Sequence, residues 1–178
     1  MTTTTDIDGL LIIEPSVFND ERGYFYETFH QERYKLPGAF PFVQDNEALS
    51  SKGVLRGLHF QRGQHAQGKL VRVVTGAVYD VAVDLREGSE TYGKSFGIVL
   101  SAENKKQFWV PRGFAHGYLV LEDDTIFSYK CDNYYYKAAE GGLKYNDPIL
   151  NISWPALDQP LIVSEKDLCL PSLTNLES

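Results

Sequence analysis

The stretch Val54-Leu-Arg-Gly-Leu-His-Phe-Gln61 sets an arginine and a histidine inside an otherwise apolar, strand-like run. Strand alternation predicts Arg56 and Leu58 on one face of this strand and His59 on the other. Buried Arg and His side chains need partners. The run therefore indicates either a polar network inside a barrel or a site that binds an anion and moves protons.

Short apolar runs separated by turn residues continue on both sides of this stretch, at the spacing typical of a sandwich, barrel or jelly roll. The expected strands are 10–13, 23–29, 70–74, 77–85, 97–100, 107–110, 118–121 and 125–130. Helix is expected only at 30–35, at 102–105 and in the tail from Ser164. Because a parallel α/β sheet needs longer amphipathic helices, the pattern predicts an all-β fold with short peripheral helices.

Size and composition limit the function classes. A chain of 178 residues suits a single domain, 1–178, and its net charge of −7 argues against DNA or RNA binding. A nucleotide-sized ligand is compatible with that charge, since a pyrophosphate needs only a few Arg or Lys side chains. Cys131 and Cys169 form no CxxC pair, and neither a signal peptide nor a membrane-spanning run is evident. We expect a cytoplasmic protein with no membrane partner.

Motifs for other chemistries are missing. A metal site needs three or four convergent ligands. His59 stands where a metal-binding barrel usually has His-x-His, while His30 and His65 have the polar context of surface residues. No nucleophile elbow, dinucleotide-binding or phosphate-binding glycine motif occurs. We therefore expect no metal and no cofactor, and acid–base chemistry by His59 is the remaining interpretation.

The strand expected at 77–85 carries Asp80 and Asp84 on one face. Two interpretations stay open at this stage. Either these carboxylates face solvent or pair with neighbouring cations, or they take a direct catalytic role.

Ordered segments along nearly the whole chain resemble those of the dTDP-4-dehydrorhamnose 3,5-epimerase family. They are Asp20-Glu-Arg-Gly23, Val43-Gln-Asp-Asn46, Val54–Gln61, Ala66-Gln-Gly-Lys-Leu-Val-Arg72, Asp80-Val-Ala-Val-Asp-Leu-Arg86, Leu100-Ser-Ala-Glu-Asn-Lys105, Pro111-Arg-Gly-Phe-Ala-His-Gly117 and Ser164-Glu-Lys-Asp167. The resemblance implies a metal-free, cupin-type jelly roll that is usually a homodimer. It further implies epimerisation of dTDP-4-dehydro-6-deoxy-glucose to dTDP-4-dehydro-rhamnose, a step toward rhamnose-containing surface polysaccharides.

The resemblance also assigns a catalytic set. His59 would be the base and Asp167 would orient its ring, although Ser164-Glu-Lys-Asp167 also has the pattern of a helix-capping box. Lys69 would lie near the keto oxygen and stabilise an enolate, and Tyr129 would return a proton from the opposite face.

Further positions match the family's substrate contacts. Arg22, Arg56, Gln44 and Asn46 match positions that hold the pyrophosphate and thymidine. The other matching contacts are Glu27, His116, Glu140 and Lys166, together with Tyr135, which matches an aromatic that stacks on the nucleotide. Any one of the three consecutive tyrosines, 134–136, could take that stacking role.

One departure is Tyr145, which stands where the family pattern has tryptophan. Alternatives to double epimerisation are a single-site 3- or 5-epimerase, a non-catalytic sugar-binding barrel and a metal-dependent cupin oxygenase. Tyr129 favours epimerisation at both carbons, and retention of the base together with the acid argues against a binding protein.

Overall fold

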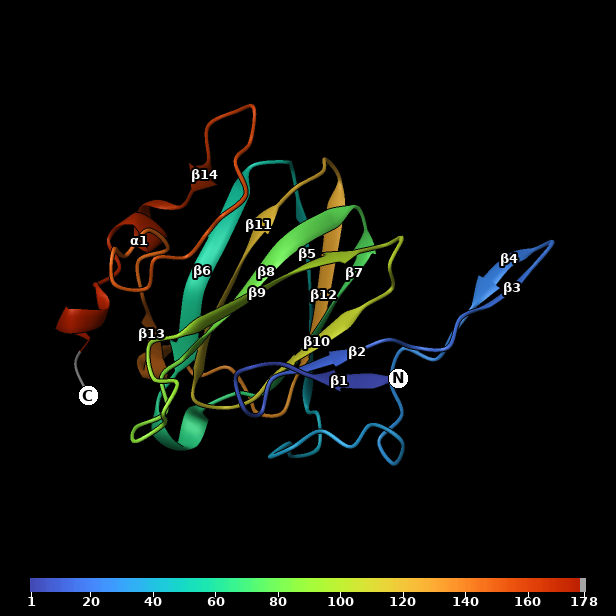
Figure 1. Ribbon diagram of the computed structural model, residues 1–178, viewed down its shortest axis with the longest axis horizontal. Helices are drawn as coiled ribbons and strands as arrows, with labels where there is room; N and C mark the ends of the chain where they lie inside the picture. The colour runs from blue at the N-terminus through green and yellow to red at the C-terminus, as the bar shows by residue number, and fades with distance from the viewer. Residues whose placement is uncertain (177–178) are drawn as a thin grey trace.

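Two antiparallel β-sheets lie face to face in the computed structural model, which describes residues 1–176 (Figure 1). The first sheet contains, in spatial order, β1 (Thr2–Thr4), β2 (Leu11–Ile13), β10 (Gln107–Val110), β7 (Lys69–Thr75), β12 (Thr125–Cys131) and β5 (Gln44–Ser50). The second contains β13 (Glu140–Gly142), β6 (Val54–Gln61), β11 (Phe114–Val120), β8 (Ala77–Asp84) and β9 (Ser95–Ser101), with the short β14 (Ile162–Val163) parallel to β6. The predicted all-β, cupin-type jelly roll is confirmed.

The main core lies between the sheets. Alternate residues of β7 and β12 point inward, so Val71, Val73 and Phe127 meet Val78 and Ala82 of β8 in one buried cluster. A second cluster lies on the outer face of the second sheet, which the chain from Leu143 onward covers. The C-terminal segment is thereby held against β6, next to the open end of the sandwich.

Helices are short. The helix α1 (Glu165–Leu168) forms in the predicted tail, and the remaining helical turns are η1 (Gly63–His65), η2 (Lys137–Ala139) and η3 (Leu173–Asn175). The prediction of helix at 30–35 was wrong. Only a turn forms there, because the ring of Tyr34 packs with Phe29 and Leu36 and the following Pro37 disfavours a continuing helix.

The prediction of helix at 102–105 was also wrong. The Asn104 side chain accepts hydrogen bonds from the backbone of Ser101 and Lys106, at 3.1 and 2.9 Å, and the backbone of Lys105 is left-handed with φ 55°. These bonds close a turn between β9 and β10 instead of a helix.

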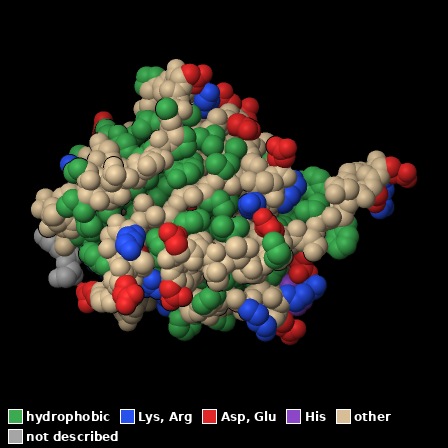
Figure 2. All heavy atoms as spheres, in the orientation of Figure 1, with side chains coloured by type: hydrophobic (Ala, Val, Ile, Leu, Met, Phe, Trp, Pro, Cys, Tyr) green, Lys and Arg blue, Asp and Glu red, His purple; other side chains and the backbone are tan. Residues whose placement is uncertain are grey.

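A hairpin of β3 (Phe18–Asp20) and β4 (Gly23–Phe25) projects from the body of the molecule (Figures 1 and 2). Figure 2 shows charged side chains at its tip and hydrophobic side chains along it. Phe18, Tyr24 and Phe25 are all exposed. The strand expected over 23–29 therefore ends at Phe25, where its pairing with β3 ends.

Candidate active site

A cavity of about 520 Å³ opens between the two sheets and is closed on one side by the C-terminal segment. Both sheets contribute to its wall, through β5, β7 and β12 on one side and β6 and β11 on the other. The predicted site residues that line it are Arg56, His59, Lys69, His116, Tyr129, Lys166 and Asp167. The catalytic set assigned from the sequence thus lies around one space.

A β-bulge in β6 brings Arg56 and His59 to the same cavity. Arg56 pairs with Tyr118 and His59 pairs with His116, so β6 advances by three residues where β11 advances by two. Gly57, with φ 113°, occupies the extra position, and an added Cβ there would meet backbone atoms of β11 at 2.7 Å. The prediction that strict alternation separates Arg56 from His59 was wrong for this reason, and Leu58 instead packs in the outer cluster.

His59 is held by the C-terminal helix. Its Nε2 lies 2.7 Å from Oδ1 of Asp167, and the other carboxylate oxygen accepts the backbone N–H of Gly57 at 3.2 Å. Ser164 caps α1 by accepting the Asp167 backbone N–H at 3.1 Å. The capping interpretation is therefore correct for Ser164, whereas the Asp167 carboxylate itself is directed at His59.

The electrostatic setting of His59 suits a base. Burial lowers the pKa of His59 below its ordinary value, and the hydrogen bond to Asp167 only partly opposes this effect. With Nε2 donating to the carboxylate, Nδ1 is the ring nitrogen left to accept a proton. The ring is thus neutral and oriented near pH 7.

Lys69 enters the cavity from β7 in the opposite sheet. Burial lowers the pKa of its ammonium group, and the nearby Cys131, Asp80 and Glu140 only partly offset that effect. No salt bridge to Lys69 is found among the residues that the structure describes. Its Nζ lies 5.9 Å from the centre of the Tyr129 ring, so a cation and a phenol adjoin in the same wall.

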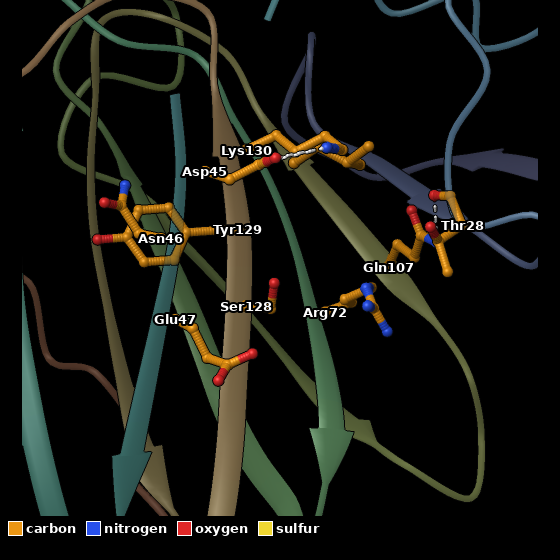
Figure 3. A pocket seen from close by; sticks show the side chains of 10 residues that line it. Thr28, Asp45, Asn46, Glu47, Arg72, Gln107, Ser128, Tyr129 and Lys130 are labelled. Carbon is orange, nitrogen blue, oxygen red and sulfur yellow. Dashed lines mark hydrogen bonds and ion pairs between the residues drawn. The ribbon is translucent and has the colours of Figure 1, made fainter. Parts of the chain in front are cut away.

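Tyr129 points into the cavity from β12. Figure 3 shows Tyr129 and Asn46 on one side of the strand and Ser128 with Arg72 on the other, around a separate hollow on the outer face of the sheet. Burial raises the pKa of the Tyr129 phenol, which keeps it protonated at neutral pH. A protonated phenol across the cavity from a neutral imidazole is the arrangement that proton transfer at two faces of one carbon requires.

Four further predicted contacts, Glu140, Tyr135, Gln44 and Asn46, do not line the cavity but form hydrogen-bonded groups that begin at Lys166 in its wall. The Glu140 carboxylate accepts from Lys166 Nζ at 2.6 Å and from the Tyr135 hydroxyl at 3.0 Å. Gln44 accepts the backbone N–H of Tyr135 at 2.9 Å and donates to Asn46 at 3.1 Å. The structure therefore brings together the predicted contacts from β5, from the chain before β13 and from α1.

Two other predicted contacts lie on or beside the β3–β4 hairpin. Arg22 sits at the tip of the β3–β4 hairpin, where it pairs with Asp20 at 2.5 Å. Glu27 pairs with Arg33 at 2.8 Å and lines a different pocket at the base of the hairpin. Within a single chain, neither residue lines the cavity that contains His59.

His116 lines the cavity with a buried carboxylate behind it. Its Nε2 lies 2.9 and 3.0 Å from the two oxygens of Asp80, which is completely buried. Asp84 is also buried, and it accepts bonds from Arg86, Ser89 and Thr91. The interpretation that these aspartates face solvent was wrong, but pairing with a neighbouring cation holds for Asp84.

Sequence reasoning missed Tyr118 and Phe127, which also line the cavity and stack with ring centres 4.1 Å apart. A signal was present, because Tyr118 follows His116 by two positions in the same strand and therefore shares its face. Phe127 likewise shares a face with Tyr129.

The chain matches the family model described as dTDP-4-dehydrorhamnose 3,5-epimerase over residues 4–175. The chain belongs to the dTDP-4-dehydrorhamnose 3,5-epimerase family. It is 52% identical to the enzyme of that name from Escherichia coli K12 over 174 residues, which cover 97% of this chain and 94% of the relative. The family consists of isomerases that act on a nucleotide sugar, and this chain is an epimerase of that kind.

Solved structures of the family share the fold closely. The epimerase of Elizabethkingia anophelis superimposes with a TM-score of 0.93 at 54% identity, covering 98% of this chain and 97% of that one. The Legionella pneumophila enzyme, crystallised with dTDP-4-keto-L-rhamnose, gives a TM-score of 0.95 at 49% identity, covering 99% of this chain and 94% of that one.

The described residues form neither a metal-binding cluster nor a membrane-spanning helix. Among the described residues, no group of three or more His, Cys, Asp or Glu side chains could hold a metal ion. In the same part of the chain, every helix is too short or too polar to span a bilayer.

Proposed function

We propose that this epimerase converts dTDP-4-dehydro-6-deoxy-D-glucose to dTDP-4-dehydro-L-rhamnose by inverting C3 and C5, and that His59, Asp167, Lys69 and Tyr129 carry the reaction. The observation that carries the proposal is the His59–Asp167 bond of 2.7 Å beside a cavity whose opposite wall holds Lys69 and Tyr129. A base, an oxyanion partner and an acid are the groups that epimerisation next to a ketone requires.

The first step is deprotonation of a carbon beside the C4 ketone. Nδ1 of His59 takes the proton, and the electron pair of the C–H bond moves to the C4 oxygen as an enolate. Asp167 stabilises the imidazolium that results, as a carboxylate does in other oriented histidine bases. The Lys69 ammonium, which has no competing salt bridge among the described residues, stabilises the enolate oxygen.

The second step is protonation from the opposite face. The Tyr129 hydroxyl gives its proton to the same carbon while the electron pair returns from the enolate oxygen. The carbon is then inverted, and the proton on His59 and the phenolate of Tyr129 exchange with water before the second carbon reacts. The raised pKa of Tyr129 keeps the phenol protonated at neutral pH, so that it can act as the acid.

The remaining predicted contacts are proposed to bind the sugar, the phosphates and the nucleotide. Arg56 and Lys166 supply positive charge in the cavity wall, and His116 supplies a ring nitrogen for the sugar. The hydrogen-bonded residues next to Lys166 are proposed to hold the thymidine: Gln44, Asn46, Tyr135 and Glu140. Tyr135 is half exposed, which leaves a face of its ring open for stacking.

We further propose a homodimer in which the β3–β4 hairpin of one chain carries Arg22 and Glu27 to the cavity of the other. The hairpin is exposed on both sides, and Phe18 and Phe25, directly paired across it, are 65% and 71% exposed. Apolar surface of that kind is covered when a partner is present. A cytoplasmic location also stays a prediction, which the free thiols of Cys131 and Cys169 support.

Proton NMR in deuterated water with dTDP-4-dehydro-6-deoxy-glucose tests the activity. Deuterium entering both carbons beside the ketone, and lost in His59→Ala, supports double epimerisation with His59 as base. His30→Ala is the matched control, because His30 lies outside the cavity and its ring accepts only a backbone N–H in the described part of the chain. Deuterium at one carbon indicates a single-site epimerase, and no exchange would overturn the proposal.

A further inference from the structure

Asp80 is a buried carboxylate that does not contact the cavity. It lies in β8, on the face that also carries the core residues Val78 and Ala82, and its exposed fraction is 0%. A carboxylate in such a position is costly unless it is hydrogen-bonded and its charge is balanced. The side chain that is hydrogen-bonded to Asp80 therefore indicates the role of Asp80.

The partner of Asp80 is His116. Both carboxylate oxygens lie within 3.0 Å of Nε2 of the ring, and no other hydrogen bond to this carboxylate occurs among the described residues. His116 lines the cavity and Asp80 does not, so the histidine stands between the carboxylate and the substrate space. Asp80 thus acts on the cavity through His116.

The ring of His116 is fixed in orientation by its surroundings. It stacks on Phe127 of the opposite sheet, with ring centres 6.2 Å apart and planes inclined by 22°. Because a carboxylate accepts hydrogen bonds, Nε2 of His116 must carry a proton. Nδ1 is then the nitrogen that remains for a ligand.

We propose that Asp80 is a positioning residue that keeps the proton of His116 on Nε2, directs Nδ1 to the substrate, and stabilises the ring when it carries a second proton. This inference rests on the proposed function. A doubly protonated ring donates from Nδ1 to the negative charge that develops on the ketone oxygen, beside the charge of Lys69 on the opposite sheet. Asp80 then balances the imidazolium, in the way that Asp167 balances His59.

The direct test is ¹⁵N NMR of the His116 ring. We expect the wild-type protein to show a protonated Nε2, and Asp80→Asn to show a mixture of the two tautomers. A wild-type ring with its proton on Nδ1 alone would overturn the proposal without any variant having to fold. Identical ring signals in the wild type and in Asp80→Asn would also overturn it.

The kinetic test uses the isosteric Asp80→Asn and His116→Ala. We expect Asp80→Asn to lower kcat for solvent exchange by about tenfold or more and to leave KM within about threefold, since the residues proposed to hold the nucleotide are unchanged. In a His116→Ala background, Asp80→Asn should have no further effect on kcat. If the two substitutions together lower kcat by the product of their separate effects, Asp80 does not act through His116 and the proposal is contradicted. A change of kcat and KM by the same factor in Asp80→Asn would indicate a merely structural role and would also contradict it.

Asp84→Asn is the matched control. Asp84 is buried on the same face of β8, four residues further on, but it accepts bonds from Arg86, Ser89 and Thr91 instead of a cavity residue. Asp84→Asn should lower the melting temperature and leave kcat unchanged. If the wild type itself exchanges no protons, the proposed function fails. If it exchanges normally and Asp80→Asn does so equally well, only the positioning role fails.

Discussion

Oδ1 of Asp167 lies 2.7 Å from Nε2 of His59, although 108 positions separate the two residues along the chain. Asp167 comes from a four-residue helix in the C-terminal segment, whereas His59 comes from β6 in the second sheet. The parallel pairing of β14 with β6 brings this segment beside the cavity. The His59–Asp167 pair therefore depends on the docking of the C-terminal segment.

Asp167→Asn should lower the rate of deuterium exchange by about 10² to 10⁴-fold, because the amide orients the wrong tautomer of His59 and cannot balance the imidazolium. Proton NMR in deuterated water measures the rate. Glu165→Gln, on the same helix but exposed, should retain wild-type exchange. Normal exchange by Asp167→Asn would remove Asp167 from the catalytic set.

The acid limb of kcat/KM should lie below pH 6.5, the ordinary pKa of histidine, because burial lowers the pKa of His59. The base form is the neutral ring, so activity is lost as the pH falls through this lowered pKa. NMR titration of His59 checks the assignment. In Asp167→Asn the titration midpoint should move lower still, since the carboxylate favours the charged ring, and an upward movement would contradict this explanation.

Lys69→Met should lower kcat by about 10² to 10³-fold, the usual effect of removing a group that stabilises an oxyanion. The same change should leave the melting temperature unchanged or raise it, because burial opposes the charged form of Lys69 and an apolar side chain carries no such cost. Activity and thermal unfolding measured together test both parts. A lower melting temperature with unchanged kcat would show that Lys69 is structural.

Tyr129→Phe should separate proton removal from inversion. His59 can still exchange the proton on its own face with deuterium, whereas the acid on the opposite face is lost. We expect deuterium to enter with retained configuration while the yield of epimer falls by about 10² to 10⁴-fold, the range for loss of a general acid. NMR coupling constants distinguish the two products. Unchanged epimer formation would exclude Tyr129 as the acid.

Mixing two inactive variants tests the exchange of hairpins between chains. Arg22→Ala and His59→Ala should each have low activity, but a mixture that is allowed to re-form dimers should regain some. In a mixed dimer, one cavity combines His59 from one chain with Arg22 from the other. Size-exclusion chromatography should show a dimer for each variant. Recovery no greater than the sum of the separate activities would contradict a cavity shared between chains.

Much of the fold was predictable because apolar residues alternate along its strands. The strands expected at 70–74, 77–85 and 107–110 all form, with bounds that differ by a residue or so. The strand β5 (Gln44–Ser50) was missed, since it lies at the edge of its sheet and five of its residues are polar or charged. An edge strand exposed on one face needs few apolar residues, so its sequence carries little strand signal.

The sequence by itself determined the family and the all-β class, and it named the residues that are proposed as the base, the acid and the cation. These properties reside in the residue types and in their order along the chain. Tertiary structure alone decided which of them meet. The bulge at Gly57 turns Arg56 and His59 to one side, and the docked C-terminal helix directs Asp167 to His59. Local periodicity cannot encode either outcome, because each depends on pairing between segments that are distant in sequence.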